Sequence, residues 1–335
     1  MKLTAWGHPY SEFPEGKDSP DDFMRAFERW SNCGIERYIP FVSSRGTAYY
    51  DSSRLKVDRD LLSSIVKSAK EFGVEVHPIL GLGPMGAGSE VRRYRIDTQR
   101  GGLKPEDIPS WARDWTCPSW EENRADAEAE AGEVAENYDI DGIHLDHVRY
   151  PNTSQINKYP CECEACCKSR EPWLGHGVLT EEDLATPGVT YREIQHRNSC
   201  VKDIALRARR IADRHGLKLS MAARAWYLRS AVAEGQDWPR WCEEGVLDFI
   251  CPMNYNLSNE TFKKLIDDDV RLVGHTRTAL YPGIGRSSSA GKMAPAQMIE
   301  QVSLCEEIGS EGVCIFHLNA LTDEDIRLLK GYKKS

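Results

Sequence analysis

Residues 139–151 read Asp139-Ile140-Asp141-Gly142-Ile143-His144-Leu145-Asp146-His147-Val148-Arg149-Tyr150-Pro151. The segment from Gly142 to Asp146 has the length and apolar content of a buried strand. Alternate side chains of a strand share a face, so His144 and Asp146 are predicted to point one way while Ile143 and Leu145 point the other way. Asp146 then lies at the carboxyl end of this strand.

The same arrangement recurs along the chain, because segments with helical periodicity end near a glycine and a short apolar run follows each of them. The runs interpreted as strands are 3–6, 37–42, 74–80, 142–146, 217–222, 247–253, 278–281 and 313–318. Strands that alternate with helices are parallel neighbours, and eight such units can close into a barrel that has no sheet edges. The predicted fold class is α/β, with one (β/α)8 TIM barrel domain over residues 1–335.

Two connections are too long for ordinary turns between a strand and a helix. Residues 81–118 follow the third strand, and residues 147–190 follow the fourth strand as a Cys-rich loop insertion. Both follow carboxyl strand ends, the face on which barrel enzymes build their sites. Helix starts are predicted at two capping pairs, Ser119 with Glu122 and Thr322 with Asp325.

Composition narrows the expected partners. The 43 Lys and Arg residues against 52 Asp and Glu residues leave a net charge of −9, with no long basic run, so nucleic acid is not expected as a partner. No apolar stretch approaches the roughly 20 residues that cross a bilayer, so no membrane partner is expected. The odd number of cysteines, 11, fits reduced thiols in the cytoplasm. A trimmed leader peptide stays open as an alternative, and the oligomeric state is unknown.

The fourth strand supplies the predicted catalytic residues. A carboxylate at the mouth of a barrel, with an imidazole two residues below it, suits a nucleophile, a charge stabiliser or a general base. Asp146 and His144 have this spacing. They are predicted to form the chemical centre of the site.

Residues 141–146, Asp141-Gly142-Ile143-His144-Leu145-Asp146, with Arg149-Tyr150-Pro151 after them, resemble the strand-4 signature of glycosyl-hydrolase-like family 10, a set of bacterial TIM-barrel proteins. The similarity extends to residues 61–80, 248–255 and 312–317. The resemblance implies hydrolysis of glycosidic bonds in a polysaccharide or glycan. No cofactor is expected for catalysis.

Glycoside hydrolysis usually requires a second carboxyl group. The loops offer Glu12, Asp51, Asp114 and Asp237. Glu12 is the preferred second catalytic carboxyl because it follows the first strand closely. The absence of a clear second acid among the strand ends also keeps a non-catalytic carbohydrate-binding barrel open.

Polar and aromatic side chains at strand ends are candidates for sugar binding, because aromatic faces pack against pyranose rings. The predicted substrate-binding residues are Trp6, His8, His77, Arg149, Arg224, Trp226, Asn254, Tyr255 and His317. Further aromatic residues near strand ends are Tyr10, Trp111, Trp115, Tyr227 and Trp238. A third hypothesis is a metal-dependent hydrolase in which His8, His77, His144 and His317 join Asp146 around an ion.

The Cys-rich loop contains Cys161, Cys163, Cys166 and Cys167. Thiolates this dense can bind a tetrahedral ion such as zinc and thereby order a loop with little apolar content. The sequence therefore predicts a structural zinc site there, completed by His176 or by a distant cysteine if one of the four thiols is not used. Free thiols or an oxidised pair are the alternatives.

Overall fold

The structure is a computed structural model of the whole chain. It describes residues 1–335 except 45, 81–91, 96–105, 107–114, 152–159 and 333–335. Trp111 and Asp114 therefore lie outside the described residues. Within the described part, no helix combines the length and the apolar character that crossing a bilayer requires.

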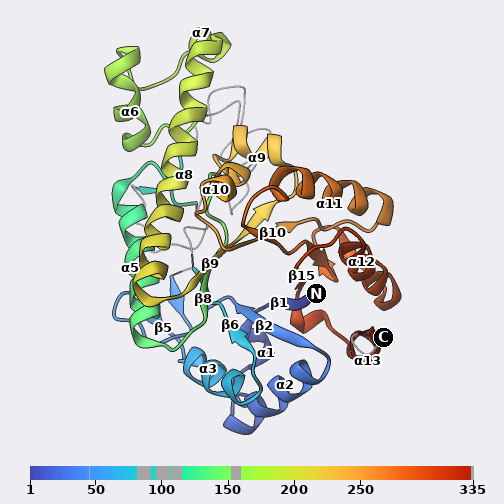
Figure 1. Cartoon of the computed structure of the whole chain (residues 1–335). Helices are drawn as coiled ribbons and strands as arrows, with labels where there is room; N and C mark the ends of the chain where they lie inside the picture. Colours follow the sequence, from blue (N-terminus) through green and yellow to red (C-terminus); the bar gives the residue numbers. More distant parts are fainter. Residues whose placement is uncertain (45, 81–91, 96–105, 107–114, 152–159, 333–335) are drawn as a thin grey trace.

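Two five-stranded sheets of parallel strands form the centre of the molecule (Figure 1). The first has the order β12 (Gly283–Gly285), β15 (Gly312–Phe316), β1 (Lys2–Gly7), β2 (Ile35–Pro40) and β6 (Glu75–Val76). The second has the order β11 (Ala279–Leu280), β10 (Phe249–Met253), β9 (Lys218–Arg224), β8 (Gly142–Leu145) and β7 (Ile79–Leu80).

The two sheets are joined because two barrel strands are each interrupted by a proline, which has no N–H for the ladder. Pro78 separates β6 from β7, and Pro282 separates β11 from β12. Both prolines still accept hydrogen bonds from the neighbouring strand. The carbonyl of Pro78 accepts the His144 N–H at 3.0 Å, and the carbonyl of Pro282 accepts the Cys314 N–H at 3.0 Å. The eight strands thus follow one another around a barrel, and the predicted (β/α)8 fold is confirmed.

Helices surround this barrel. They are α2 (Pro20–Asn32), α3 (Leu61–Glu71), α5 (Glu121–Asn137), α8 (Pro187–His215), α10 (Trp238–Glu243), α11 (Asn259–Val273), α12 (Pro295–Glu307) and α13 (Asp323–Tyr332). Apolar side chains between helices and strands form a large core, and a second, smaller cluster fills the barrel interior. The interior cluster fills the barrel below its mouth and includes Trp6, Phe249 and Tyr281.

One predicted cap is confirmed and the other is wrong. Thr322 and Asp325 exchange the bonds of a capping pair at the start of α13. Ser119 does not cap α5, which begins after Trp120 without a side-chain cap. The Ser119 hydroxyl instead contacts Tyr150, His196 and the thiol of Cys166, because the chain around it folds against the Cys-rich loop.

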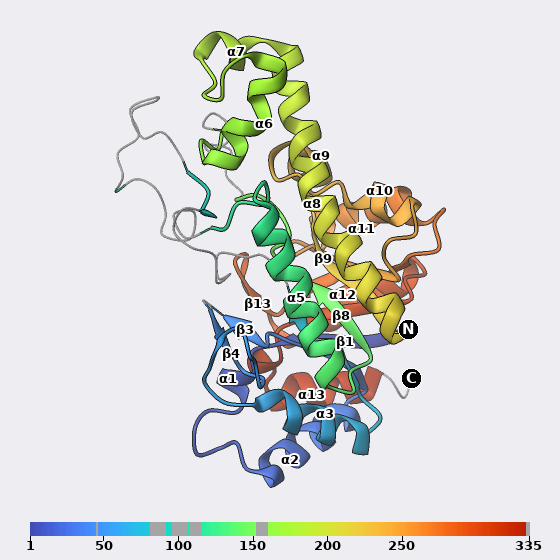
Figure 2. The same cartoon turned by 90° about the vertical axis from the view of Figure 1, so that its left-hand side faces the viewer.

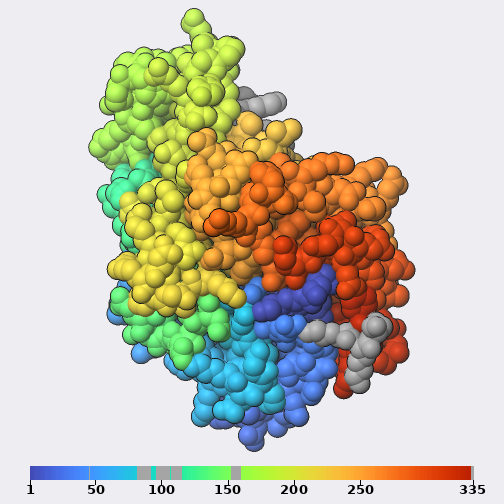
Figure 3. Space-filling model, viewed as in Figure 1, coloured from blue at the N-terminus to red at the C-terminus, as the bar shows by residue number. Residues whose placement is uncertain are grey.

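Residues after β8 form an excursion at one end of the molecule. Helices α6 (Glu164–Leu174) and α7 (Glu181–Ala185), with the first turns of α8, extend beyond the barrel (Figures 1 and 2). The space-filling view shows the same projection (Figure 3). Shorter elements lie near the strand ends, among them α1 (Pro9–Glu12), α9 (Tyr227–Ala233) and the hairpin β13 (Ser287–Ser288) and β14 (Gly291–Lys292).

Candidate functional site

A cavity of about 450 Å³ opens at the carboxyl ends of the strands. Its walls come from several barrel units, and its size falls in the range of small-molecule sites. The lining residues are Trp6, His8, Tyr10, Phe41, Ser43, Ser44, Asp146, His147, Arg149, Ala222, Arg224, Ala225, Trp226, Met253, Tyr255, Asn256, Leu265, Ser289 and Phe316. Six of the nine predicted substrate-binding residues are in this set.

Asp146 follows directly after β8 and lines the cavity. Its side chain is largely buried, with 8% of the residue exposed. One carboxylate oxygen accepts a hydrogen bond from the backbone N–H of His147 at 2.6 Å. The other oxygen lies 3.4 Å from Nε2 of the His147 ring. Among the described lining residues, Asp146 is the only carboxylate.

His147 was missed by the sequence analysis. Strand alternation would point this residue away from the barrel axis, but its φ of 58° lies in the left-handed region that non-glycine residues rarely adopt. The turn brings its ring between Asp146 and Arg149, whose Nη2 is 3.5 Å from Nδ1. Burial lowers the pKa of His147, whereas the nearby Asp146 carboxylate raises it. Such backbone strain is typical of functional positions.

Two arginines form one side of the cavity and share a buried acid. Nε of Arg149 and Nε of Arg224 each lie 3.5 Å from a carboxylate oxygen of Glu234, which is 1% exposed. Burial raises the pKa of Glu234, and the two guanidinium groups act in the opposite direction. Arg149 also lies over the ring of Trp115, 4.7 Å from its centroid, and its carbonyl accepts the Trp115 indole N–H. Both guanidinium groups thus line the cavity and are held beside a common acid.

Aromatic rings form the floor of the cavity and part of its wall. Tyr255 stacks on Phe316 with 5.3 Å between ring centroids, and the edge of Trp6 meets Tyr255 at 6.2 Å. His8 meets Phe316 edge to face at 5.8 Å and stacks on Phe41 at 4.7 Å with nearly parallel rings. Trp226 differs from these residues because it is 62% exposed at the rim. An exposed apolar ring beside a cavity offers a platform for a sugar ring.

His8 is neutral at neutral pH. Burial, together with the neighbouring His317 ring, lowers its pKa to about 4, although the Asp146 carboxylate acts in the opposite direction. The centroids of His8 and His317 are 5.0 Å apart. His317 itself lies beside the described lining instead of within it. A neutral imidazole can both donate and accept hydrogen bonds, as recognition of hydroxyl groups requires.

His144 and His77 lie below the cavity, inside the barrel. Nε2 of His144 accepts the indole N–H of Trp6 at 3.1 Å, and Nδ1 lies 2.8 Å from the Ser220 hydroxyl. Both ring nitrogens are thus occupied, and burial holds the pKa of His144 well below its usual range. His77 is fully buried near Glu75, with 3.4 Å between Nε2 and a carboxylate oxygen. Neither predicted residue lines the cavity, because both precede the carboxyl ends of their strands and therefore lie deeper in the barrel.

Glu12 and Asn254 also point away from the cavity. The Glu12 carboxyl group bonds the Tyr38 hydroxyl and accepts the backbone N–H of His8 at 3.1 Å. Tyr38 packs on the helix side of β2, so the turn of α1 directs Glu12 to the outside of the barrel wall. Asn254 donates to the buried Asp269 of α11 at 2.6 Å. The structure therefore does not bring Glu12 to Asp146.

Asp51 and Asp237 are also absent from the residues that line the cavity. Asp51 is exposed, and its backbone N–H donates to the Tyr138 hydroxyl. Asp237 accepts a hydrogen bond from Tyr227 at the start of α10. Trp238 is fully buried behind the cavity wall, and Trp115 supports Arg149 from below the surface. Of the additional aromatic residues that the structure describes, Tyr10 is the one that lines the cavity.

Metal-ligating side chains converge at one place in the described part of the chain, and it is not the cavity. Of the four histidines of the third hypothesis, His8 lines the cavity and His317 lies beside its lining, whereas the other two are in the barrel interior. Cys161, Cys163 and Cys166 do come together, but the fourth thiol of their group is Cys117. Cys167 is outside this group, because the next residue of a helix points in a different direction from Cys166.

Comparison with solved structures identifies the fold. The chain matches the glycoside hydrolase domain of PgaB (BpsB) from Bordetella bronchiseptica with a TM-score of 0.80, 13% identity, and coverage of 98% of both chains. It matches α-L-fucosidase isoenzyme 2 from Paenibacillus thiaminolyticus with a TM-score of 0.68 and 16% identity, over 100% of this chain and 49% of that one.

A third match is the β-galactosidase from the psychrophilic Marinomonas ef1, with a TM-score of 0.70, 12% identity and coverage of 100% of this chain and 59% of that one. The chain has the TIM-barrel fold of glycoside hydrolases. It spans about half the length of the fucosidase and somewhat more of the galactosidase. No family model and no curated protein match the sequence, so membership of glycosyl-hydrolase-like family 10 stays a prediction.

Proposed function

We propose that the chain is a glycoside hydrolase of the glycosyl-hydrolase-like family 10 type that cleaves glycosidic bonds in an oligo- or polysaccharide. The observation that carries the proposal is the position of Asp146, a carboxylate at the mouth of a TIM barrel in a cavity with aromatic walls. The glycosidase fold of the solved structures supports the same reading. Asp146 would stabilise the positive charge that develops on the sugar ring, or attack the anomeric carbon.

The neighbours of Asp146 are suited to orienting this carboxylate. The His147 N–H holds one oxygen, and the His147 ring faces the other. Arg149 and Arg224 have N–H groups for sugar hydroxyls or for an acidic substituent, and their shared partner Glu234 limits the net positive charge. Trp226 and Tyr255 would hold pyranose faces. Among the described lining residues there is no second carboxylate that could protonate the leaving oxygen.

The test is hydrolysis by the purified chain. The first assay is a panel of aryl glycosides, which includes α-L-fucosides and β-galactosides because the structural neighbours are named after these substrates. Reducing-end assays on polysaccharides complete the search for a substrate. On that substrate we expect Asp146→Asn to lower kcat by at least about 10²-fold, the lower end of what one positioned catalytic group contributes. The melting temperature should change little, because the amide has the same shape.

Asp268→Asn is the matched control, since this carboxylate is exposed on α11 outside the cavity lining. It should leave kcat unchanged. Activity of Asp146→Asn within a few-fold of the wild type would contradict the proposal.

A second candidate function is a carbohydrate-binding barrel without catalysis. The specific observation in its favour is that Asp146 has no second carboxylate beside it among the described lining residues. Calorimetric titration with oligosaccharides, followed by product analysis after long incubation, separates the two candidates. Binding without any product would favour the binding protein, and product formation would favour the hydrolase.

A further inference from the structure

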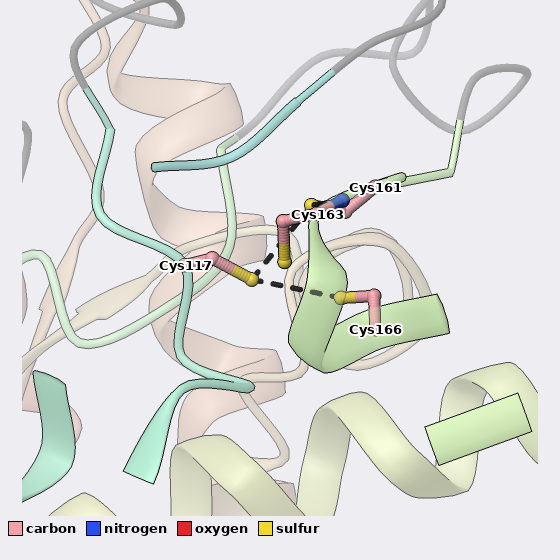
Figure 4. A group of neighbouring side chains, drawn as sticks. All are labelled: Cys117, Cys161, Cys163 and Cys166. Carbon is pink, nitrogen blue, oxygen red and sulfur yellow. Dashed lines mark hydrogen bonds between the residues drawn. The ribbon is translucent and has the colours of Figure 1, made fainter. Parts of the chain in front are cut away.

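Four cysteine side chains meet between the Cys-rich loop and the segment before α5 (Figure 4). The Sγ atoms of Cys117, Cys161, Cys163 and Cys166 all lie within 4.8 Å of one another. All four residues are buried, with exposed fractions from 0% to 3%. Cys117 is distant in sequence from the other three, so their meeting is a product of the fold.

The sulfur spacing fits a tetrahedral metal centre. Sγ of Cys117 is 3.6 Å from Sγ of Cys166 and 3.8 Å from Sγ of Cys161. Four sulfurs bound at about 2.3 Å to a zinc ion occupy the corners of a tetrahedron with edges of about 3.8 Å. A disulfide would instead require an S–S distance of about 2.05 Å. Thiols are weak hydrogen-bond donors and acceptors, so hydrogen bonds between them would add little stability to a cluster of four.

Polar groups around the cluster are directed at the sulfurs. The backbone N–H groups of Arg95 and Cys163 donate to Sγ of Cys161 at 3.3 Å and 3.5 Å. The Ser119 hydroxyl lies 3.0 Å from Sγ of Cys166 and contacts Nε2 of His196 at 2.9 Å. Hydrogen bonds of this kind stabilise the negative charge of thiolate ligands and orient them.

We propose that Cys117, Cys161, Cys163 and Cys166 bind one zinc ion. A site with four sulfur ligands leaves no open position for water or substrate, so its role is structural. The ion ties the segment before α5 to the start of α6. Since that segment also contains Trp115, which packs on Arg149, the zinc site supports one wall of the cavity from outside it.

The experiment measures metal in the full chain, produced in zinc-supplemented medium and purified with a reductant and without chelators. Elemental analysis should find about one zinc ion per chain, as a single four-thiolate site requires. Cys117→Ser and Cys163→Ser should each lose nearly all of this zinc. Cys167→Ser is the matched control, because this neighbouring thiol is outside the group, and it should retain the zinc.

A second measurement does not depend on whether the variants fold. Wild-type chain refilled with cobalt(II) should show the intense visible absorption of a tetrahedral thiolate site, and added zinc should abolish it. Reduced wild-type chain that takes up no zinc, stoichiometric iron in place of zinc, or a disulfide within the cluster would each overturn the proposal. Loss of zinc from Cys167→Ser that equals the loss from Cys117→Ser would overturn the ligand assignment.

Discussion

Two buried acids near the barrel mouth have opposite surroundings. Asp146 faces a cavity that solvent and ligands can enter. Asp269 of α11 is 1% exposed and has Asn254 as its hydrogen-bond partner. Burial raises the pKa of Asp269 to about 8, against the lowering effect of the Asn254 amide. Asp269 and Asn254 thus form a buried polar pair that supports the strand end without contacting a ligand.

This pair leads to a pH prediction. Between about pH 4 and pH 8, Asp269 is protonated in the folded chain but ionised in the unfolded chain. The free energy of unfolding therefore falls as pH rises through this range. Asp269→Asn cannot release that proton. From pH 5 to pH 8, its unfolding free energy should therefore rise relative to the wild type by at least about 1 kcal/mol, roughly one pKa unit.

Urea unfolding at both pH values measures the difference. Glu260→Gln is the control, because this exposed carboxylate is on the same helix but is not among the charges that act on Asp269. Its unfolding free energy should change between the two pH values as that of the wild type does. Parallel stability curves for Asp269→Asn and the wild type would show that the Asp269 pKa is not raised.

At the scale of secondary structure elements, close packing inside the barrel sets where a glycine is needed. Gly142 begins β8, where a Cβ atom would lie 2.3 Å from Nδ1 of His77 and 2.8 Å from the carbonyl oxygen of Lys218. Both neighbours belong to adjacent barrel strands, and one of them is backbone. At these distances a neighbour would have to shift, so the position of His77 and the start of β8 depend on each other.

Gly142→Ala should therefore destabilise the chain by about 1–3 kcal/mol, the usual effect of overpacking a core. The measurement is the urea unfolding midpoint at pH 7. Gly132→Ala in α5 is the control, because its nearest neighbour is a side-chain carbon of Ile211 at 3.7 Å. Alanine favours helix, so this variant should be neutral or more stable by up to about 1 kcal/mol. Equal stability of Gly142→Ala and the wild type would contradict the predicted clash.

At the scale of the whole molecule, the excursion formed by α6, α7 and the first turns of α8 projects beyond the barrel (Figure 2). Arg170 of α6 is 1% exposed and forms a two-point ion pair with Glu193 of α8, at 2.9 Å and 2.8 Å. Arg170 also donates to the carbonyl of Gly177. This buried pair fastens the excursion to the long helix, and the cysteine cluster lies at its base.

Glu193→Ala should loosen the excursion, because it leaves the Arg170 charge buried without its partner, which typically costs about 3–5 kcal/mol. Hydrogen exchange followed by mass spectrometry should show faster exchange in residues 164–186 while the barrel strands keep their protection. Glu182→Ala, at an exposed position of α7, is the control. Uniformly faster exchange throughout the chain would indicate that the excursion and the barrel unfold together.

Local patterns were sufficient for much of the architecture. Strand periodicity and the glycines that end helices depend on neighbouring residues, so the eight barrel strands could be predicted, as could the position of Asp146 at a strand end. Three of the four clustered cysteines are also close in sequence. The interruption at Pro78 was not predicted, because residues 74–80 were interpreted as one continuous strand. The continuation of the seventh strand beyond Pro282 as β12 was not predicted either, because that run was ended at residue 281.

The surroundings of each side chain depended on the fold. Glu12 follows the first strand closely, but a short helix directs it outward to Tyr38. His147 enters the cavity through a left-handed turn that alternation cannot predict. Glu234 and Cys117 meet their partners across long stretches of sequence.

Periodicity and turn residues act over a few positions, so the order of amino acids is enough to predict the barrel and the strand that presents Asp146. The groups around that carboxylate, and the cysteine that completes the sulfur cluster, are set by the folded arrangement of distant segments. Contacts between distant segments depend on how whole elements pack, and no local pattern records them.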